Sequence, residues 1–368
     1  MGFDGNLVTV ADYEQYCRQV TSPALYEYLY GEPGDPNWST YTSNRAALEH
    51  LELRPRVLVD VSDRRLATTL LGTELSLPVV IGPTGILRDL DPAGEIGTAR
   101  GAGQAGALFV LSSFSSASAQ EVAAAAGGPW WQQVFLYRDR GLTHWQASRA
   151  AELGASAIVL TVSNTAQSFH HQTLRFPPAS ATAIAQEPAT HLDGYGTVPA
   201  PTYVDLTNDL DVGATWADVD WLRSQTDLPL VIKGIQTAAD AQIAVEHGVE
   251  GIVVSNHGGR FLQGARGTIA ALPEIVEAAG DQAQVSVDGG IRSGEDVLKA
   301  LALGARTAWV GRAARWAQSV GGQAGIEGLL EIFRRELDAA MGLCGVTDVT
   351  AVPRDLVGLA RHAAWCEA

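Results

Sequence analysis

The sequence contains little cysteine, and what it contains is scattered. Cys17, Cys344 and Cys366 are the three cysteines among 368 residues, and their spacing matches no metal-ligand pattern. A disulfide framework and a cysteine-based metal site are therefore excluded, and this usage is typical of the reducing cytoplasm. We expect a cytoplasmic protein without a bound metal.

Long apolar runs and an excess of positive charge are also missing. No run approaches the roughly 20 residues of a membrane-spanning helix, and residues 1–4 do not open a basic segment followed by an apolar one, as in a signal peptide. The formal net charge is −16, which argues against nucleic acid or an anionic membrane as a partner. A small molecule is the expected partner.

Short apolar segments are present instead, and helical segments, often rich in alanine, separate most of them. Examples of these helical segments are residues 94–105, 119–126, 143–153 and 238–247. Repeated alternation of buried strand and helix is typical of an α/β protein with a TIM (β/α)₈ barrel. The eight expected strands are Val79–Thr84, Leu108–Ser113, Trp131–Leu136, Ala157–Val162, Leu228–Ile235, Gly251–Asn256, Gln284–Gly290 and Thr307–Arg312.

The chain is expected to form one domain over residues 1–368. A leading segment, residues 1–78, is helical from about Val10 to Glu52 and then extended at 57–61 and 73–77. The barrel covers residues 79–340, and its last helix covers 325–341. The stretch between the fourth and fifth strands is too long for a plain helix with its linkers, so its part 168–211, rich in Pro, Thr, Ala and His, predicts an active-site lid loop.

The sixth expected strand ends in a motif with catalytic potential. Residues 255–260 read Ser-Asn-His-Gly-Gly-Arg, and in a barrel this end of the strand lies at the reactive rim. His257 can take a proton near neutral pH, and Arg260 can hold a carboxylate with two hydrogen bonds. A base beside a carboxylate clamp suits oxidation of a 2-substituted acid, although a loop histidine beside a turn would look the same.

The last two expected strands predict a phosphate site. They end in Asp288-Gly289-Gly290-Ile291-Arg292 and in Val310-Gly311-Arg312. Glycine N–H groups can approach an anion closely, a helix follows each turn, and barrels commonly hold phosphate after these strands. The alternative is a pair of ordinary strand–turn–helix glycines.

Other strand ends carry one polar residue each, as a large planar polar ring would require. Lys233 can stabilise negative charge on such a ring, and Gln133 and Thr161 can hydrogen-bond to it. Lys233 could equally form a Schiff base, as in barrel aldolases, and the other two could bond within the rim.

These motifs resemble the FMN-dependent α-hydroxy acid oxidase/dehydrogenase family, which includes glycolate oxidase, lactate oxidase and mandelate dehydrogenase. The resemblance covers nearly the whole chain, including Arg54–Val61. It implies FMN as cofactor, O₂ or another electron acceptor, and a homotetramer. It also implies catalytic roles for His257 and Lys233, substrate contacts from Arg260 and Tyr28, and an FMN site built from Pro83, Thr84, Gly85, Ser112, Gln133, Thr161, Lys233, Ser255, Asp288, Gly289, Gly290, Arg292, Gly311 and Arg312.

Several substrate-side positions depart from the family pattern. Ser163 stands where the family has an aspartate bonded to the catalytic histidine, and Phe135 replaces a tyrosine. His170 occupies the place of a second substrate-binding arginine, and residues 261–263 read Phe-Leu-Gln instead of Gln-Leu-Asp. Gly85, where many family oxidases carry alanine, is expected to leave room over the flavin.

The cofactor positions are thus intact while substrate contacts at Phe135, Ser163 and His170 have changed. We expect an FMN-dependent oxidoreductase for a 2-hydroxy acid-like, 2-amino or amine-containing substrate of a specialised biosynthetic pathway. Without a carboxylate at position 163, His257 should be a weaker base than in relatives. The alternatives are an oxidase of an amine or peptide-like natural-product precursor, a non-redox FMN isomerase, a Schiff-base lyase and a non-catalytic scaffold.

Overall fold

In a computed structural model, eight parallel strands close into a barrel, as the sequence predicts. The structure describes residues 7–30, 38–164, 189, 192, 194–196 and 201–360. The barrel closes where β11 pairs with β4, for example Val310 with Ile81. Its strands are β4 (Val79–Ile81), β5 (Leu108–Leu111), β6 (Trp130–Val134), β7 (Ile158–Thr161), β8 (Leu230–Ile235), β9 (Gly251–Val254), β10 (Gln284–Asp288) and β11 (Ala308–Val310).

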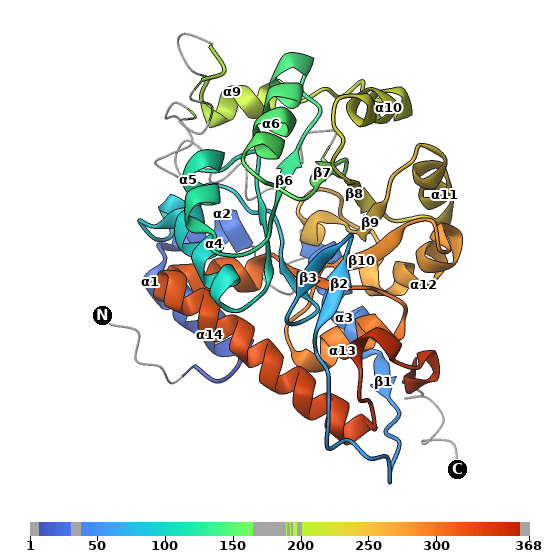
Figure 1. Ribbon diagram of the computed structural model, residues 1–368. Coiled ribbons are helices and arrows are strands. Elements are labelled where there is room, and N and C mark those ends of the chain that lie inside the picture. The colour runs from blue at the N-terminus through green and yellow to red at the C-terminus, as the bar shows by residue number, and fades with distance from the viewer. Residues whose placement is uncertain are drawn as a thin grey trace.

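Each strand stops before its predicted last residue or at it, because the polar residues beyond it turn into loops. Helices surround the barrel (Figure 1), and several begin at a Ser or Thr whose hydroxyl accepts a backbone N–H, as at Ser118, Thr237 and Ser293. The surrounding helices are α4 (Gly94–Gln104), α5 (Ala119–Ala125), α6 (Arg140–Glu152), α10 (Trp216–Ser224), α11 (Ala238–Glu246), α12 (Thr268–Ala279), α13 (Gly294–Ala302) and α14 (Arg312–Cys344).

The last helix is longer than predicted. The expected segment 325–341 is only the second part of α14, which starts at Arg312 directly after the last strand. A kink at Gly322, with φ 53° and ψ −131°, separates the two parts. Figure 1 shows α14 crossing the molecule with α1 (Val10–Val20) against it.

The barrel interior is filled by apolar side chains from alternate strand positions. The indole rings of Trp131 and Trp309 lie 6.1 Å apart between their centroids. A hairpin of β2 (Thr68–Leu70) and β3 (Thr73–Leu75) adds Leu70 and Leu75 to this same cluster. Since the hairpin precedes β4, it packs against the amino ends of the strands and leaves the carboxyl ends for the site.

The leading segment differs from its prediction in two places. It contains α1, α2 (Pro23–Tyr30) and α3 (Ser39–Glu49), but residues 51–53 form strand β1, which pairs with β12 (Val357–Leu359) at the far end of the chain. Residues 57–61 form no strand, and Leu58 has φ 59°. Tertiary pairing thus overrides the helical pattern at residues 51 and 52.

Most of the predicted lid, residues 168–211, lies outside the described residues. Its described end contains α9 (Tyr203–Asn208), so the loop prediction is wrong there. The hydroxyl of Thr202 accepts from the N–H of Asp205, whose carboxylate accepts in return, and this pair starts the helix. No helix among the described residues has the length and apolar character needed to cross a membrane.

Candidate active site

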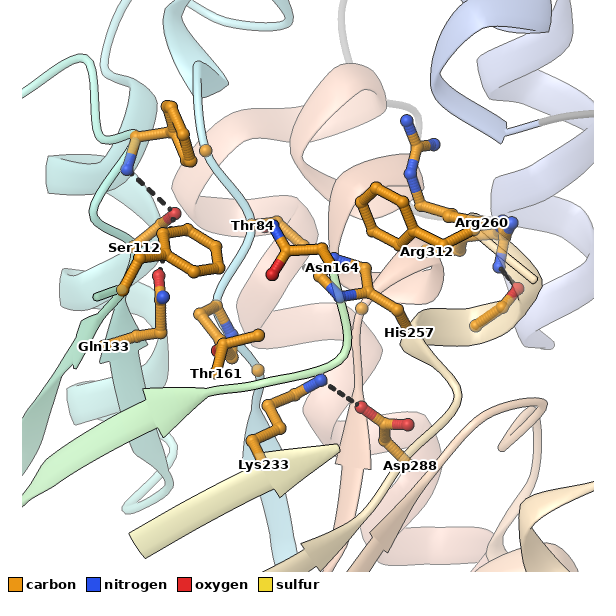
Figure 2. Close-up of a pocket in the computed structure, with 18 of the residues that line it drawn as sticks. Thr84, Ser112, Gln133, Thr161, Asn164, Lys233, His257, Arg260, Asp288 and Arg312 are labelled. Carbon is orange, nitrogen blue, oxygen red and sulfur yellow. Dashed lines mark hydrogen bonds and ion pairs between the residues drawn. The ribbon is translucent and has the colours of Figure 1, made fainter. Parts of the chain in front are cut away.

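A cavity of about 880 Å³ opens at the carboxyl ends of the strands. Figure 2 shows Lys233 and Asp288 at its base, with Ser112 and Gln133 on one side and His257, Arg260 and Arg312 on the other. The barrel topology brings these residues together from distant parts of the chain. The predicted residues that line the cavity are Pro83, Thr84, Gly85, Ser112, Gln133, Phe135, Thr161, Lys233, His257, Arg260, Asp288, Gly289, Gly290, Arg292, Gly311 and Arg312.

Four predicted residues do not line the cavity in the described structure. Ser163 and Ser255 lie behind it and bond to residues that do. Tyr28 belongs to α2, but its side chain is outside what the structure describes, as is the whole of His170. The predicted substrate contacts of these last two therefore stay predictions.

A buried network fixes Lys233. Its Nζ donates to Ser255 Oγ at 2.9 Å and lies 2.7 Å from Asp288 Oδ2. Ser255 Oγ donates to the same carboxylate oxygen at 2.9 Å and accepts from the N–H of His257 at 3.1 Å. Because the ammonium is buried against a carboxylate, it is held as a fixed positive charge at the base of the cavity.

Four buried polar atoms on cavity-lining residues have no hydrogen-bond partner among the described residues. They are Nε2 of Gln133, Oδ1 of Asp288, Nη2 of Arg312 and Nε of Arg315. Gln133 is held in place because its Oε1 accepts from the N–H of Ser113 at 2.9 Å. Unsatisfied buried polar atoms are costly, so this set fits a polar ligand such as the flavin mononucleotide that the resemblance implies.

The predicted phosphate end fits an anion. Gly289 and Gly290 have φ of 98° and 90°, and a Cβ on Gly289 would lie 2.7 Å from Thr268 Oγ1. The positive φ values and this close approach both require glycine. Arg292 stacks on the Trp316 ring at 4.4 Å, and Gly311 precedes the first turn of α14. The N-terminus of α14, the turn at Gly289 and Gly290, and the guanidinium of Arg292 together suit a phosphate.

Contacts on several sides hold His257. Its φ is 56°, a left-handed conformation that is uncommon outside glycine. Ser163 Oγ lies 3.0 Å from Nδ1, and the Phe261 ring packs edge-on at 4.7 Å between centroids. The imidazole is therefore oriented by a hydroxyl from the end of β7, where Ser163 was predicted to face the histidine.

The surroundings of His257 lower its pKa well below the usual value of 6.5. Burial is the largest cause, and the positive charges of Lys233, Arg260 and Arg312 add to it. Both effects disfavour the charged imidazolium. The direction agrees with the expected weak base, and the neutral imidazole is the form able to accept a proton.

The two arginines near His257 contact the end of α2. Arg260 Nη1 donates to the carbonyl of Leu29, and Arg312 Nε donates to that of Tyr30 at 2.9 Å. Arg312 also donates to the carbonyl of Gly258 and stacks on the Tyr41 ring at 4.4 Å. Burial chiefly lowers the pKa of Arg312, to about 9. Two of its nitrogens are thus committed to carbonyls rather than directed to the phosphate end.

An apolar wall faces the His257 side of the cavity, and the sequence prediction identified only part of it. The rings of Phe114 and Phe135 lie 5.3 Å apart, and Leu210 of the strand–helix connection also lines the cavity. Phe135 was predicted from its place two residues after Gln133. The lining residues that were missed include Asn164, Arg138, Tyr203 and Arg315. Asn164 directly follows Ser163. The strand-end rule, by which the residues at the carboxyl ends of barrel strands form the site, could therefore have found it.

The expected role of Gly85 is wrong. A Cβ at this position would lie 2.4 Å from the carbonyl oxygen of Phe114. That carbonyl also accepts from the N–H of Ile86 at 2.9 Å, so the two loops are joined there. Glycine is required by this close approach of backbone, not by space over a ring.

Comparisons with known proteins agree with this geometry. A family model described as FMN-dependent dehydrogenase matches residues 17–359. The chain is 38% identical to an L-lactate oxidase of Nostoc sp., over 96% of this chain and 98% of that protein. It is 36% identical to glycolate oxidase 3 of Arabidopsis thaliana, over 95% of each. A crystal structure of mandelate oxidase superposes with a TM-score of 0.85 at 37% identity, covering 96% of this chain and 98% of that one.

Proposed function

Since the chain belongs to the family of FMN-dependent dehydrogenases, it is an FMN-binding oxidoreductase, and we propose that it oxidises a 2-hydroxy acid larger than glycolate or lactate to the 2-oxo acid. The observation that carries the proposal is the position of His257 and Arg260 on the same cavity as the unsatisfied polar atoms of Gln133 and Asp288. A base and a carboxylate clamp thus share one cavity with the groups suited to the cofactor.

The roles of the residues follow from their chemistry. Bound FMN supplies the acceptor for the two electrons that leave the substrate. Arg260 holds the substrate carboxylate, and neutral His257 takes one of the two protons that the substrate loses. Lys233, fixed by Asp288, places a positive charge where negative charge accumulates. Gln133 and Thr161 would hydrogen-bond to the ring, while Gly290, Arg292 and Gly311 would hold the phosphate.

The size of the substrate is inferred from the apolar wall. Phe114, Phe135, Leu210 and Phe261 line the cavity, and Phe135 offers no hydroxyl to a small polar substrate. Burying an apolar substituent against these rings is favourable by about 25 cal/mol per Å². We therefore favour a 2-hydroxy acid with a bulky apolar substituent, as a specialised biosynthetic enzyme would use.

Anaerobic bleaching of the flavin tests this function. The purified protein is expected to be yellow and to lose its visible absorbance with 2-hydroxy acids that carry aryl or long alkyl groups, and more slowly with glycolate. His257→Gln should keep the colour and lose the bleaching. A yellow protein that no 2-hydroxy acid bleaches would refute the proposal.

An amine-containing substrate is the second candidate. The absence of a carboxylate at Ser163 and of a hydroxyl at Phe135 removes two groups suited to a hydroxy acid. The same experiment with 2-amino acids and amines separates the two functions, and turnover without any bleaching would indicate the isomerase. Peroxide formation in air would identify O₂ as the electron acceptor.

We also propose self-association as a homotetramer. An apolar patch, Val57, Leu58, Val59 and Leu343, lies on the surface, where Val57 is 80% and Leu343 76% exposed. The N–H of Arg56 donates to the carbonyl of Cys344, which joins the two segments. Contiguous exposed apolar groups of this kind mark interaction sites. The cytoplasmic location expected from the cysteine content stays a prediction.

A further inference from the structure

The contact between Ser163 and His257 differs chemically from a carboxylate–imidazole contact. Ser163 Oγ lies 3.0 Å from Nδ1. An ionised carboxylate only accepts, so it fixes the proton on Nδ1 and leaves Nε2 as the base. A hydroxyl donates or accepts, so Ser163 bonds to both neutral tautomers and to the imidazolium, but it supplies no charge to the imidazolium.

The charges around His257 are positive. Lys233 from β8, Arg260 after β9 and Arg312 from α14 all disfavour its protonated form. The cavity carboxylate of Asp288 is engaged by Lys233 at 2.7 Å and by Ser255 at 2.9 Å. Among the described residues, no carboxylate makes a hydrogen bond to this imidazole. A proton taken up by His257 therefore finds no carboxylate of the described residues bonded to the imidazole.

The proposed reaction places a proton on this imidazole. A 2-hydroxy acid becomes a 2-oxo acid by losing two electrons and two protons. Bound FMN would accept the electrons with one proton, and the other proton would move to His257. The substrate also brings a carboxylate, which Arg260, three residues along the same turn, is placed to hold.

We propose that Ser163 is a positioning residue that holds His257 without charge, so that the positive charge His257 acquires in the reaction is balanced by the carboxylate of the bound substrate. The inference rests on the proposed function. It assigns the substrate's carboxylate a second role besides anchoring, which is to make His257 a sufficient base only when the correct anion is bound.

Proton uptake on binding tests this directly, without turnover. Oxalate is a probe that carries carboxylates and cannot be oxidised through a C–H bond. Titration calorimetry of the holoenzyme with oxalate, in buffers of different ionisation enthalpy, gives the number of protons taken up at each pH. We expect uptake in the wild type with a maximum below pH 6.5, and no uptake in His257→Gln.

Ser163→Asp and Ser163→Asn form a matched pair of nearly equal size that differ in charge. In Ser163→Asp the imidazole already has an anion beside it, so the maximum of uptake should move to higher pH by about one unit or more. Ser163→Asn should stay within a few tenths of a unit of the wild type, as should the conservative Ser163→Thr. An equal shift in the Asp and Asn variants would overturn the inference.

The comparison of proton uptake between the wild type and His257→Gln tests the inference even if the position-163 variants do not fold. A wild type that takes up no more protons than His257→Gln would by itself refute the balancing role. These outcomes are distinct from failure of the proposed function, in which no 2-hydroxy acid bleaches the flavin. Bleaching by 2-hydroxy acids without His257-dependent proton uptake would leave the function standing and remove the inference.

Discussion

The conformation of His257 depends on its neighbours in the chain. Its φ of 56° is followed by φ values of 65° and 77° at Gly258 and Gly259. A Cβ on Gly259 would lie 2.4 Å from the backbone nitrogen of Tyr41. The tight left-handed turn is therefore possible only with glycine at this position, and it holds the imidazole over the cavity. Such strain is common at functional sites.

The lowered pKa of His257 predicts the pH dependence of the reaction. A base whose pKa lies below its usual 6.5 is neutral at pH 7, and only the neutral form accepts a proton. The ratio kcat/KM reports the ionisation of the uncomplexed enzyme. It should therefore be flat through pH 7 and fall only below about pH 6.5. An acidic limb centred above pH 7 would contradict the assigned base.

The substitutions Gly85→Ala and Gly342→Ala are expected to change the free energy of unfolding in opposite directions. Gly85→Ala should destabilise the protein by about 1–3 kcal/mol, because its Cβ meets the Phe114 carbonyl. Gly342→Ala should stabilise it by about 0.5–1 kcal/mol, because this glycine is helical and its Cβ meets only Arg64 atoms at 3.7 Å. Denaturant unfolding measures both free energies. An unchanged free energy of unfolding in Gly85→Ala would contradict this prediction and support open space at that position.

At the scale of elements, Glu95 of α4 connects two loops of the cavity wall. Its buried carboxylate accepts from the N–H groups of Leu87 and Ser116 at 3.1 and 3.0 Å, and from the hydroxyl of Ser116. These loops follow β4 and β5 and position Thr84 and Ser112. One carboxylate inside the ring of helices thus fixes part of the proposed flavin site.

Glu95→Ala should weaken both the fold and cofactor binding. Each buried donor left unsatisfied costs about 1–3 kcal/mol, and the loops that position Thr84 and Ser112 lose their connection. Thermal unfolding of the apoprotein and a titration with FMN measure the two effects. Glu121→Ala is the control, because this exposed carboxylate caps α5 and otherwise makes a surface ion pair with Arg88 at 3.4 Å. Its loss should cost about 1 kcal/mol. Unchanged FMN affinity in folded Glu95→Ala would refute the positioning role.

The elements that could be predicted are those with a local signal. The strands β4 to β11 were found because buried apolar runs alternate with helical segments. The helix α9 had a visible signal in Thr202 and Asp205 that was missed. The pairing of β1 with β12 joins residues 51–53 to 357–359, and no local pattern reveals it. The kink at Gly322 depends on packing near Asp91, so the sequence could not place it either.

At the scale of the molecule, the strand-end rule predicted most of the site. It found Lys233, Gln133 and His257, because a barrel brings the carboxyl ends of its strands to one rim. It missed Arg138 and Tyr203, which lie in loops and helices beyond the strands, where side-chain direction depends on tertiary packing. The turning of Arg312 toward Tyr30 could not be predicted for the same reason.

If the exposed apolar patch is an interface, a charge introduced in it should weaken the proposed tetramer. Light scattering after size exclusion should give the mass of a tetramer for the wild type. Leu58→Asp should lower that mass, because an interface would bury the charge without a partner. Val20→Asp, an exposed residue at the end of α1, should leave the mass unchanged. A wild-type monomer, or equal masses for all three proteins, would refute an interface at Val57, Leu58, Val59 and Leu343.

The indole rings at the centre of the barrel give the protein its own optical reporter. Trp309 lines the cavity, Trp131 lies 6.1 Å beneath it, and Trp316 supports Arg292. Isoalloxazine absorbs in the region where indole emits, so excitation energy would pass from these rings to a flavin bound in the cavity. Loading the apoprotein with FMN should therefore quench its ultraviolet emission. The FMN dissociation constants of the variants can then be measured by fluorescence, without any catalytic assay.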